Sequence, residues 1–143
     1  MVFREANVED IPALSGIRLS VKENVLSDPG KVTTEMYVAY LSESGKGWLC
    51  EIDGEVVGFS VASLNDGSIW ALFVKPGYEG KGIGARLLKL AADWLFDMGA
   101  TSIILSTDAN TRADRLYERQ GWSRGEVRAD GEVGYRLDKT SPI

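Results

Sequence analysis

Residues 74–85 read VKPGYEGKGIGA, and this stretch decides the fold of the chain. An apolar run at 69–74 leads into it and an amphipathic segment at 85–98 leads out, so the order is strand, glycine-rich loop and helix. Three alternating glycines let the backbone turn tightly and come close to a ligand. The first turn of the following helix offers unpaired N–H groups and the positive end of its dipole. Such a loop is typical of an anion site, above all for phosphate groups.

The charge and spacing of this loop narrow the choice of phosphate ligand. Four cations lie in or beside it, so we expect a positive local charge: Lys75, Lys81, Arg86 and Lys89. The glycines formally satisfy the dinucleotide pattern G-x-G-x-x-G/A, but that pattern begins almost directly after its strand. Here residues 75–79 intervene, and too few residues follow for a doubly wound domain. The other common phosphate pattern, G-x-x-x-x-G-K-[ST], is absent from the sequence.

The composition fits one globular domain and excludes several kinds of site. The 143 residues are 44% hydrophobic and 26% charged, and the net charge of −5 argues against a nucleic-acid partner. With no histidine and one cysteine, Cys50, a single chain can form neither an internal disulfide nor a Ser-His-Asp or Cys-His catalyst. We also expect no metal site. The charged first residues do not resemble a signal peptide, and no apolar run could span a membrane, so the expected location is cytoplasmic.

Apolar spacing and turn residues predict the other elements. They are, in order, a strand at 2–6, a helix from the cap Asn7 to about Glu23, a shorter helix ended by Gly45 and Gly47, a hairpin around Asp53-Gly54, the central strand, the loop and its helix, a strand at 102–107, a helix at 111–120 and a hairpin around Asp130-Gly131. The helix after the loop should make the two strands that it joins parallel. The order β-α-α-β-β-β-α-β-α-β-β therefore predicts an α/β fold with a mixed sheet.

Two segments of this arrangement resemble the GNAT N-acetyltransferase superfamily. Residues 73–76 followed by the glycines at 80–84 resemble its acetyl-coenzyme A loop, Q/R-x-x-G-x-G/A. The pattern Asn110-x-x-Ala113-x-x-Leu116-Tyr117-Glu118-x-x-Gly121-Trp122 resembles its second signature. The resemblance spans nearly the whole chain and implies one N-acetyltransferase domain, 1–143, with a sheet splayed at its centre. The chain departs from the pattern at Glu79, the Q/R position, and at Ser68, where some members carry a glutamate base.

The resemblance implies acetyl transfer from acetyl-CoA to a primary amine of a small molecule or peptide. The loop N–H groups would hold the cofactor diphosphate, and the splayed strand would pair with the pantetheine arm through Leu72 and Val74. The N–H of Val74 is the expected donor to the oxyanion. The cofactor-binding residues that the resemblance implies are Leu72, Phe73, Val74, Glu79, Gly80, Lys81, Gly82, Ile83, Gly84, Ala85, Asn110 and Tyr117.

Two residues are the catalytic candidates that follow from the resemblance. Tyr117 lies at the position of the general acid, and a phenol of pKa about 10 is protonated at neutral pH. Glu23 is a candidate base, with Asp66, Glu51 or a water chain as alternatives. A competing interpretation makes Tyr117 a half-buried aromatic residue and Glu23 a solvated helix end. The missing glutamate at Ser68 also leaves open a non-catalytic acyl-CoA sensor or partner module, and the family resemblance allows a homodimer.

Overall fold

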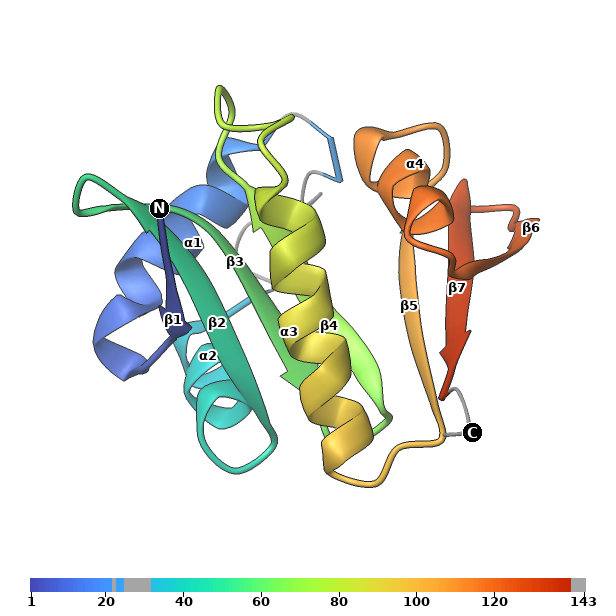
Figure 1. Cartoon of the computed structure of the whole chain (residues 1–143), viewed down its shortest axis with the longest axis horizontal. Helices are drawn as coiled ribbons and strands as arrows, with labels where there is room; N and C mark the ends of the chain where they lie inside the picture. Colours follow the sequence, from blue (N-terminus) through green and yellow to red (C-terminus); the bar gives the residue numbers. More distant parts are fainter. Residues whose placement is uncertain (22, 25–31, 140–143) are drawn as a thin grey trace.

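The computed structural model describes residues 1–21, 23–24 and 32–139 (Figure 1). Its elements are, in order, β1 (Val2–Glu5), a 3-10 turn (Val8–Asp10), α1 (Ile11–Ser20), α2 (Thr34–Leu41), β2 (Gly45–Ile52), β3 (Glu55–Ser63), β4 (Ser68–Val74), α3 (Ile83–Asp97), β5 (Ser102–Asp108), α4 (Arg112–Arg119), β6 (Ser123–Val127) and β7 (Glu132–Asp138). The seven strands of the described residues form one sheet in the order β1-β2-β3-β4-β5-β7-β6. The predicted α/β order is confirmed.

Helices cover both faces of the sheet, and each face has its own apolar core (Figure 1). On one face Leu87 of α3 shares a core with Ile103 of β5 and Tyr117 of α4. On the other face Leu14 of α1 shares a core with Phe59 of β3. All five side chains are buried. The sheet is thus packed against helices on both sides.

Side chains cap three helical N-termini, whereas that of α3 is left open. Asn7, Thr33 and Thr111 accept backbone N–H groups in the first turns of the segments that follow them. α3 has Gly82 in this position, and no described side chain caps its first turn. The N–H groups of that turn are therefore available to a bound anion.

Two boundaries differ from the sequence prediction. α1 ends at Ser20 rather than near Glu23, where the Ser20 hydroxyl donates to the carbonyl of Ile17 (2.7 Å) and the next residue is extended. β2 begins at Gly45, where a helix end was predicted. A Cβ on Gly45 would lie 1.9 Å from the carbonyl oxygen of Ala62, so the glycine serves close strand packing and not a helix terminus.

β4 and β5 are neighbours in the sheet but pair at one end only. Ser68 lies opposite Ile104, whose N–H donates to the carbonyl of Gly67 (3.1 Å), and no other described pair of residues joins the two strands. A β-bulge marks the start of the separation, because the register of β4 on β3 skips Trp70. Beyond this point β4 and β5 diverge (Figure 1). The predicted central splay is confirmed, and it leaves one edge of β4 open.

Candidate functional site

The loop between β4 and α3 forms a pocket of about 410 Å³ with α4, which we call the loop pocket. Its walls include Tyr78, Gly80, Gly82, Ile83 and Leu116. Gly80 and Gly82 have φ angles of 76° and 80°, the left-handed region that favours glycine. A Cβ on either would meet no atom within 4 Å, so these glycines are needed for the turn and not for space. Together with the uncapped N-terminus of α3, the loop offers backbone N–H groups to an open pocket.

The cations of the loop pocket come from α4, which sequence analysis did not predict. Of the four expected cations, Lys75 pairs with Glu55 (2.6 Å), Lys89 pairs with Asp93 (3.1 Å) and Arg86 lies over the Phe3 ring (5.3 Å). Instead the pocket is lined by two arginines of α4, Arg112 and Arg119. Arg112, Leu116 and Arg119 are spaced at i, i+4 and i+7, so they lie on one face of the helix. This spacing is the sequence signal from which the two arginines could have been predicted.

Glu79 stays beside this pocket and braces the loop. Its Oε1 accepts the N–H of Gly77 at 2.7 Å, so the carboxylate closes the turn at 77–79. Glu79 lines two pockets, the loop pocket and the neighbouring pocket beside the open edge of β4. The departure from the family pattern therefore has a structural role within the loop itself.

The open edge of β4 presents the backbone of Leu72 and Val74. The N–H of Lys75 donates to the carbonyl of Val57 on β3 (2.7 Å). Because successive backbone groups alternate along a strand, those of Leu72 and Val74 face the other side, where β5 has moved away. Beside this edge lies a middle pocket of about 260 Å³, lined among others by Leu72, Phe73, Val74, Glu23 and Arg112.

Deeper along the splay lies an inner pocket of about 250 Å³, whose walls include Arg18, Leu72, Asp108, Tyr117 and Glu132. Leu72 lines both the middle and the inner pocket, and Val74 lines both the middle and the loop pocket. The three pockets therefore adjoin one another along β4, from the N-terminus of α3 to the centre of the sheet, and we call them together the cleft. Beyond the inner pocket, β6 and β7 help to line a wider outer pocket of about 720 Å³.

Tyr117 is buried but presents its hydroxyl to the inner pocket. The residue is 4% exposed, and its ring packs against the rings of Trp122 (6.2 Å between centroids) and Tyr135 (5.4 Å). Within the described part of the chain the hydroxyl makes no hydrogen bond. Burial raises the pKa of Tyr117 well above its ordinary value, so the phenol keeps its proton at neutral pH. The arrangement leaves one proton donor free to serve a ligand in the cleft.

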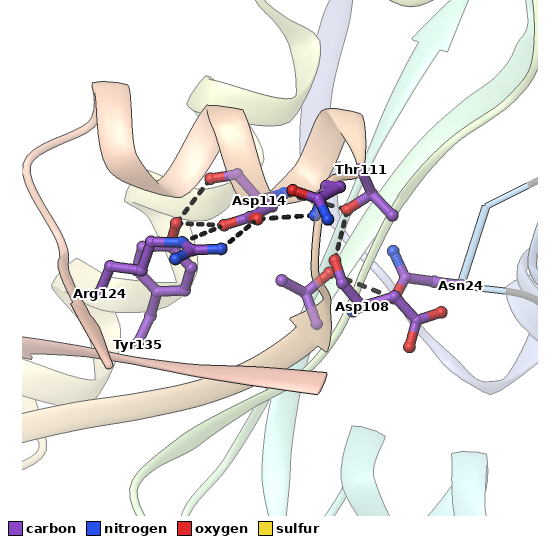
Figure 2. Close-up of polar contacts among 8 residues, drawn as sticks. Asn24, Asp108, Thr111, Asp114, Arg124 and Tyr135 are labelled. Atoms are coloured by element: carbon purple, nitrogen blue, oxygen red, sulfur yellow. Dashed lines mark hydrogen bonds and ion pairs between the residues drawn. The ribbon is translucent and has the colours of Figure 1, made fainter. Parts of the chain in front are cut away.

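An ion pair between the buried carboxylate of Asp114 and the partly exposed Arg124 fixes the helix that carries Tyr117 (Figure 2). Arg124 of β6 donates to both carboxylate oxygens of Asp114 on α4, at 3.0 and 2.9 Å. The hydroxyl of Tyr135 on β7 donates to the same carboxylate, and the N–H of Asn110 reaches its Oδ2 at 2.9 Å. The Arg124 bonds hold the pKa of Asp114 far below its usual range. This brace joins α4 to β6 and β7, and sequence analysis did not predict it, because Asp114 reads as an ordinary helix residue.

Residues 23 and 24, which follow α1 after a gap in the described chain, reach across the cleft. Oε1 of Glu23 accepts the N–H of Arg112 at the start of α4 (3.0 Å). Oδ1 of Asn24 accepts the N–H of Asp108 (2.7 Å), as Figure 2 shows, and the hydroxyl of Thr107 (3.2 Å). Glu23 thus lies in the middle pocket at a helix N-terminus, whereas Tyr117 lines the inner pocket.

The other predicted site residues are not all in the cleft. Asn110 has a left-handed φ of 63° in the turn before α4, and neither it nor Lys81 lines the loop, middle or inner pocket. Of the alternative bases, Glu51 is paired with Arg4 (2.6 Å) and Asp66 accepts the Ser68 hydroxyl (2.6 Å) in the outer pocket. Two carboxylates that sequence analysis did not single out line the inner pocket instead, those of Asp108 and Glu132.

The structure also bears on membrane-spanning helices, on metal-binding clusters and on Cys50. No helix among the described residues is long and apolar enough to cross a membrane. In the same residues no group of three His, Cys, Asp or Glu side chains is placed to hold a metal ion. Cys50 is buried and unpaired with another cysteine.

Comparisons with known proteins agree on one family. An uncharacterized N-acetyltransferase of Methanocaldococcus jannaschii is 37% identical over 103 residues, which are 66% of either chain. An uncharacterized N-acetyltransferase of Escherichia coli is 27% identical over 135 residues, 85% of this chain and 81% of the relative. The crystal structure of the PaiA N-acetyltransferase from Thermoplasma acidophilum in complex with coenzyme A superposes with a TM-score of 0.81 at 16% identity, covering 96% of this chain and 98% of that one.

The matches cover different shares of this chain and of its relatives. The match covers 63% of the length of an uncharacterized N-acetyltransferase of Archaeoglobus fulgidus and 66% of the length of the Methanocaldococcus jannaschii relative, just under two thirds of each. The profile of the Acetyltransferase (GNAT) family matches residues 17–122, which contain β4, the loop, α3 and α4. The fold, the splayed sheet and this match lead to one conclusion: the chain belongs to the acetyltransferase (GNAT) family.

Proposed function

We propose that the protein is an acetyl-CoA-dependent N-acetyltransferase that moves an acetyl group to a primary amine. The observation that carries the proposal is the splay between β4 and β5, because Tyr117, whose hydroxyl makes no hydrogen bond with any described residue, lines the pocket that the splay opens. A module that only binds the cofactor has no need of a proton donor at this place. Cytoplasmic location and a homodimer remain predictions from the sequence.

The cofactor would lie along the cleft with its diphosphate in the loop pocket. Backbone N–H groups at 80–84 and the guanidinium groups of Arg112 and Arg119 supply the positive charge. The pantetheine arm would then pass the open edge of β4 and pair with the backbone of Leu72 and Val74. The remaining predicted cofactor residues on this wall are Phe73, Glu79, Ile83, Gly84 and Ala85.

This placement brings the thioester to the inner pocket. The amine nitrogen attacks the thioester carbon and forms the N–C bond, and the carbonyl oxygen takes up negative charge. Of the two β4 residues with open N–H groups, Leu72 lines the same pocket as Tyr117 and Val74 does not, so we propose Leu72 in place of Val74 as the oxyanion donor. The C–S bond then breaks, and Tyr117 donates its proton to the leaving thiolate.

The amine must lose a proton before or during the attack. Glu23 is the base that sequence analysis proposed, but its carboxylate already accepts an N–H at the start of α4 and lies in the middle pocket. Asp108 and Glu132 line the inner pocket with Tyr117 and are nearer to the proposed reaction. The variants Glu23→Gln, Asp108→Asn and Glu132→Gln test the three candidates for the base. Only the variant that removes the base should change the acidic limb of the pH profile of kcat/KM.

The test of the function is release of free coenzyme A thiol from acetyl-CoA in the presence of a panel of primary amines. We expect release above the hydrolysis blank with at least one amine, and matching N-acetyl product by mass spectrometry. Tight binding of acetyl-CoA without acetylation of any amine in a broad panel would favour the non-catalytic sensor instead.

A further inference from the structure

Arg18 is a half-buried cation in the wall of the inner pocket. It comes from α1 and lines the same pocket as Tyr117. Its guanidinium carbon lies 4.2 Å from the centroid of the Phe73 ring, and Nη1 donates to the backbone carbonyl of Asn24 at 2.5 Å. The stacked ring and the carbonyl fix the orientation of the planar group, and among the described residues its other N–H donors have no hydrogen-bond partner.

The charge of Arg18 is not balanced by an acid of the described chain. Arg4, Arg124, Arg128 and Arg136 each lie within 4.0 Å of a carboxylate oxygen, whereas Arg18 forms no such ion pair with any described residue. Burial lowers the pKa of Arg18, and its electrostatic interactions with Tyr37 and Asp108 oppose this only in part. A guanidinium that has lost water without gaining a counter-ion is unfavourable, and a bound anion would offset that cost.

The pocket therefore holds charges of both signs in a small volume. Within about 250 Å³ the walls bring Arg18 together with two carboxylates, Asp108 and Glu132. Carboxylates favour the ammonium end of a ligand, and the planar fork of a guanidinium suits a carboxylate or phosphate. A polyamine would satisfy the two acids but would place a cation against Arg18. A small ligand with an amine and an anionic group satisfies all three.

We propose that the acceptor is a small primary amine that also carries an anionic group, and that Arg18 binds this group. The inference rests on the proposed acetyltransferase function and names its substrate class. The anion is placed on the α1 side of the inner pocket, and the amine on the side of Tyr117, Asp108 and Glu132. Arg18 is thus a specificity residue, which binds the acceptor away from the reacting atoms.

The test compares amines that differ only in the anionic group. The panel contains free amino acids, their amides, amines that carry a phosphate ester, the matching amino alcohols, and polyamines. We expect a kcat/KM for the anionic member of a pair about 10- to 100-fold above that of its neutral partner, the span of one hydrogen bond to a charged group. The amino acid and phosphate arms decide which anion is bound.

Arg18→Gln should remove this preference. We expect it to lower kcat/KM about 10- to 100-fold for the anionic acceptor and to leave the neutral partner and coenzyme A affinity nearly unchanged. Arg18→Lys, which keeps the charge but not the fork, should restore part of the preference. Arg86→Gln is the matched control, because Arg86 also lies over an aromatic ring, Phe3, but lines none of the pockets of the cleft.

The outcomes separate this inference from the proposed function. Equal turnover of anionic and neutral amines by the unaltered protein, or an equal loss for both in Arg18→Gln, overturns the role of Arg18 while the acetyltransferase stands. Absence of acetyl transfer to every amine overturns both. If Arg18→Gln fails to fold, the acid-to-amide ratio of the unaltered protein still decides the substrate class.

Discussion

The two walls of the cleft work by different means. The wall of β4 and α3 acts through its backbone: the loop N–H groups, the uncapped helix start and the open edge of Leu72 and Val74. The opposite wall acts through side chains from separate segments, among them Arg18, Arg112 and Tyr117. A backbone site depends on a local pattern of glycines and strand residues, whereas a side-chain site depends on how distant segments pack. We therefore expect substitutions on the first wall to act through the backbone and its local charge, and substitutions on the second wall to act through the side chain that is lost.

The largest expected effect is on the side-chain wall, at Tyr117. Tyr117→Phe keeps the ring that packs against Trp122 and Tyr135 and removes only the hydroxyl. We expect kcat to fall about 10²- to 10⁴-fold, the usual effect of losing a positioned general acid, which is roughly 3–5 kcal/mol of barrier. Steady-state kinetics measures kcat, and calorimetry should show nearly unchanged affinity for coenzyme A.

The control for Tyr117→Phe is Tyr40→Phe, because Tyr40 stacks on Trp70 (4.4 Å between centroids) and does not line the inner pocket. It should retain full turnover. Unchanged kcat in Tyr117→Phe would exclude the residue as the acid. An unfolded Tyr117→Phe variant would mean that the hydroxyl serves the core, and the proton donor would then have to be sought elsewhere in the cleft.

The brace behind Tyr117 should control stability and its pH dependence. Asp114→Asn removes the buried carboxylate that Arg124 binds, and we expect a loss of about 1.5–3 kcal/mol in the free energy of unfolding, the usual contribution of hydrogen bonds to a charged group. The folded pKa of Asp114 lies below its ordinary value of 3.8. The stabilisation is therefore complete above pH 3.8 and is lost as the pH falls towards the folded pKa.

Denaturant unfolding at pH 7 and at about pH 3 tests this prediction. The difference in stability between the unaltered protein and Asp114→Asn should shrink as the pH falls. Asp93→Asn is a matched control, since Asp93 forms an exposed i,i+4 pair with Lys89 on α3 and should change stability by less than about 1 kcal/mol. A difference that is independent of pH would show that Asp114 is not ionised in the folded protein.

The backbone wall is tested next, at Gly82. Gly82→Asp adds a Cβ where φ is 80° and a negative charge at the open end of α3. We expect coenzyme A to bind about 10- to 100-fold more weakly by calorimetry, since one charge-assisted contact is replaced by repulsion. Gly99→Asp is the control, because its φ of 108° is equally unfavourable and it lies at the other end of α3. An equal loss of affinity in both variants would make the effect one of strain and not of charge.

The same division explains how much could be predicted from the sequence. The loop follows from the contiguous pattern at 69–85, and the splay followed from the family resemblance that this segment and residues 110–122 carry; the role of Tyr117, in the second segment, stays a prediction. Arg18 and Glu132 are far apart in the chain and lie in one pocket only because α1 and β7 meet the splay. The prediction that lysines near the loop supply its positive charge was wrong for Lys75 and Lys89, for a related reason. Both are close to the loop in sequence, but they form ion pairs with Glu55 and Asp93.

The smallest expected effect is at Glu79, where the backbone wall carries a side chain that the family pattern does not. Glu79→Gln keeps an oxygen that can accept the N–H of Gly77 and removes a negative charge next to the proposed diphosphate. We expect coenzyme A affinity to be unchanged or about two- to fivefold tighter by calorimetry, the range of a partly screened charge. Glu79→Ala, which also loses the bond to the N–H of Gly77, should bind coenzyme A more weakly than Glu79→Gln does. The control Glu43→Gln should leave the affinity for coenzyme A unchanged. A clear weakening in Glu79→Gln would mean that the carboxylate itself contacts the cofactor, and this wall would then no longer act through its backbone alone.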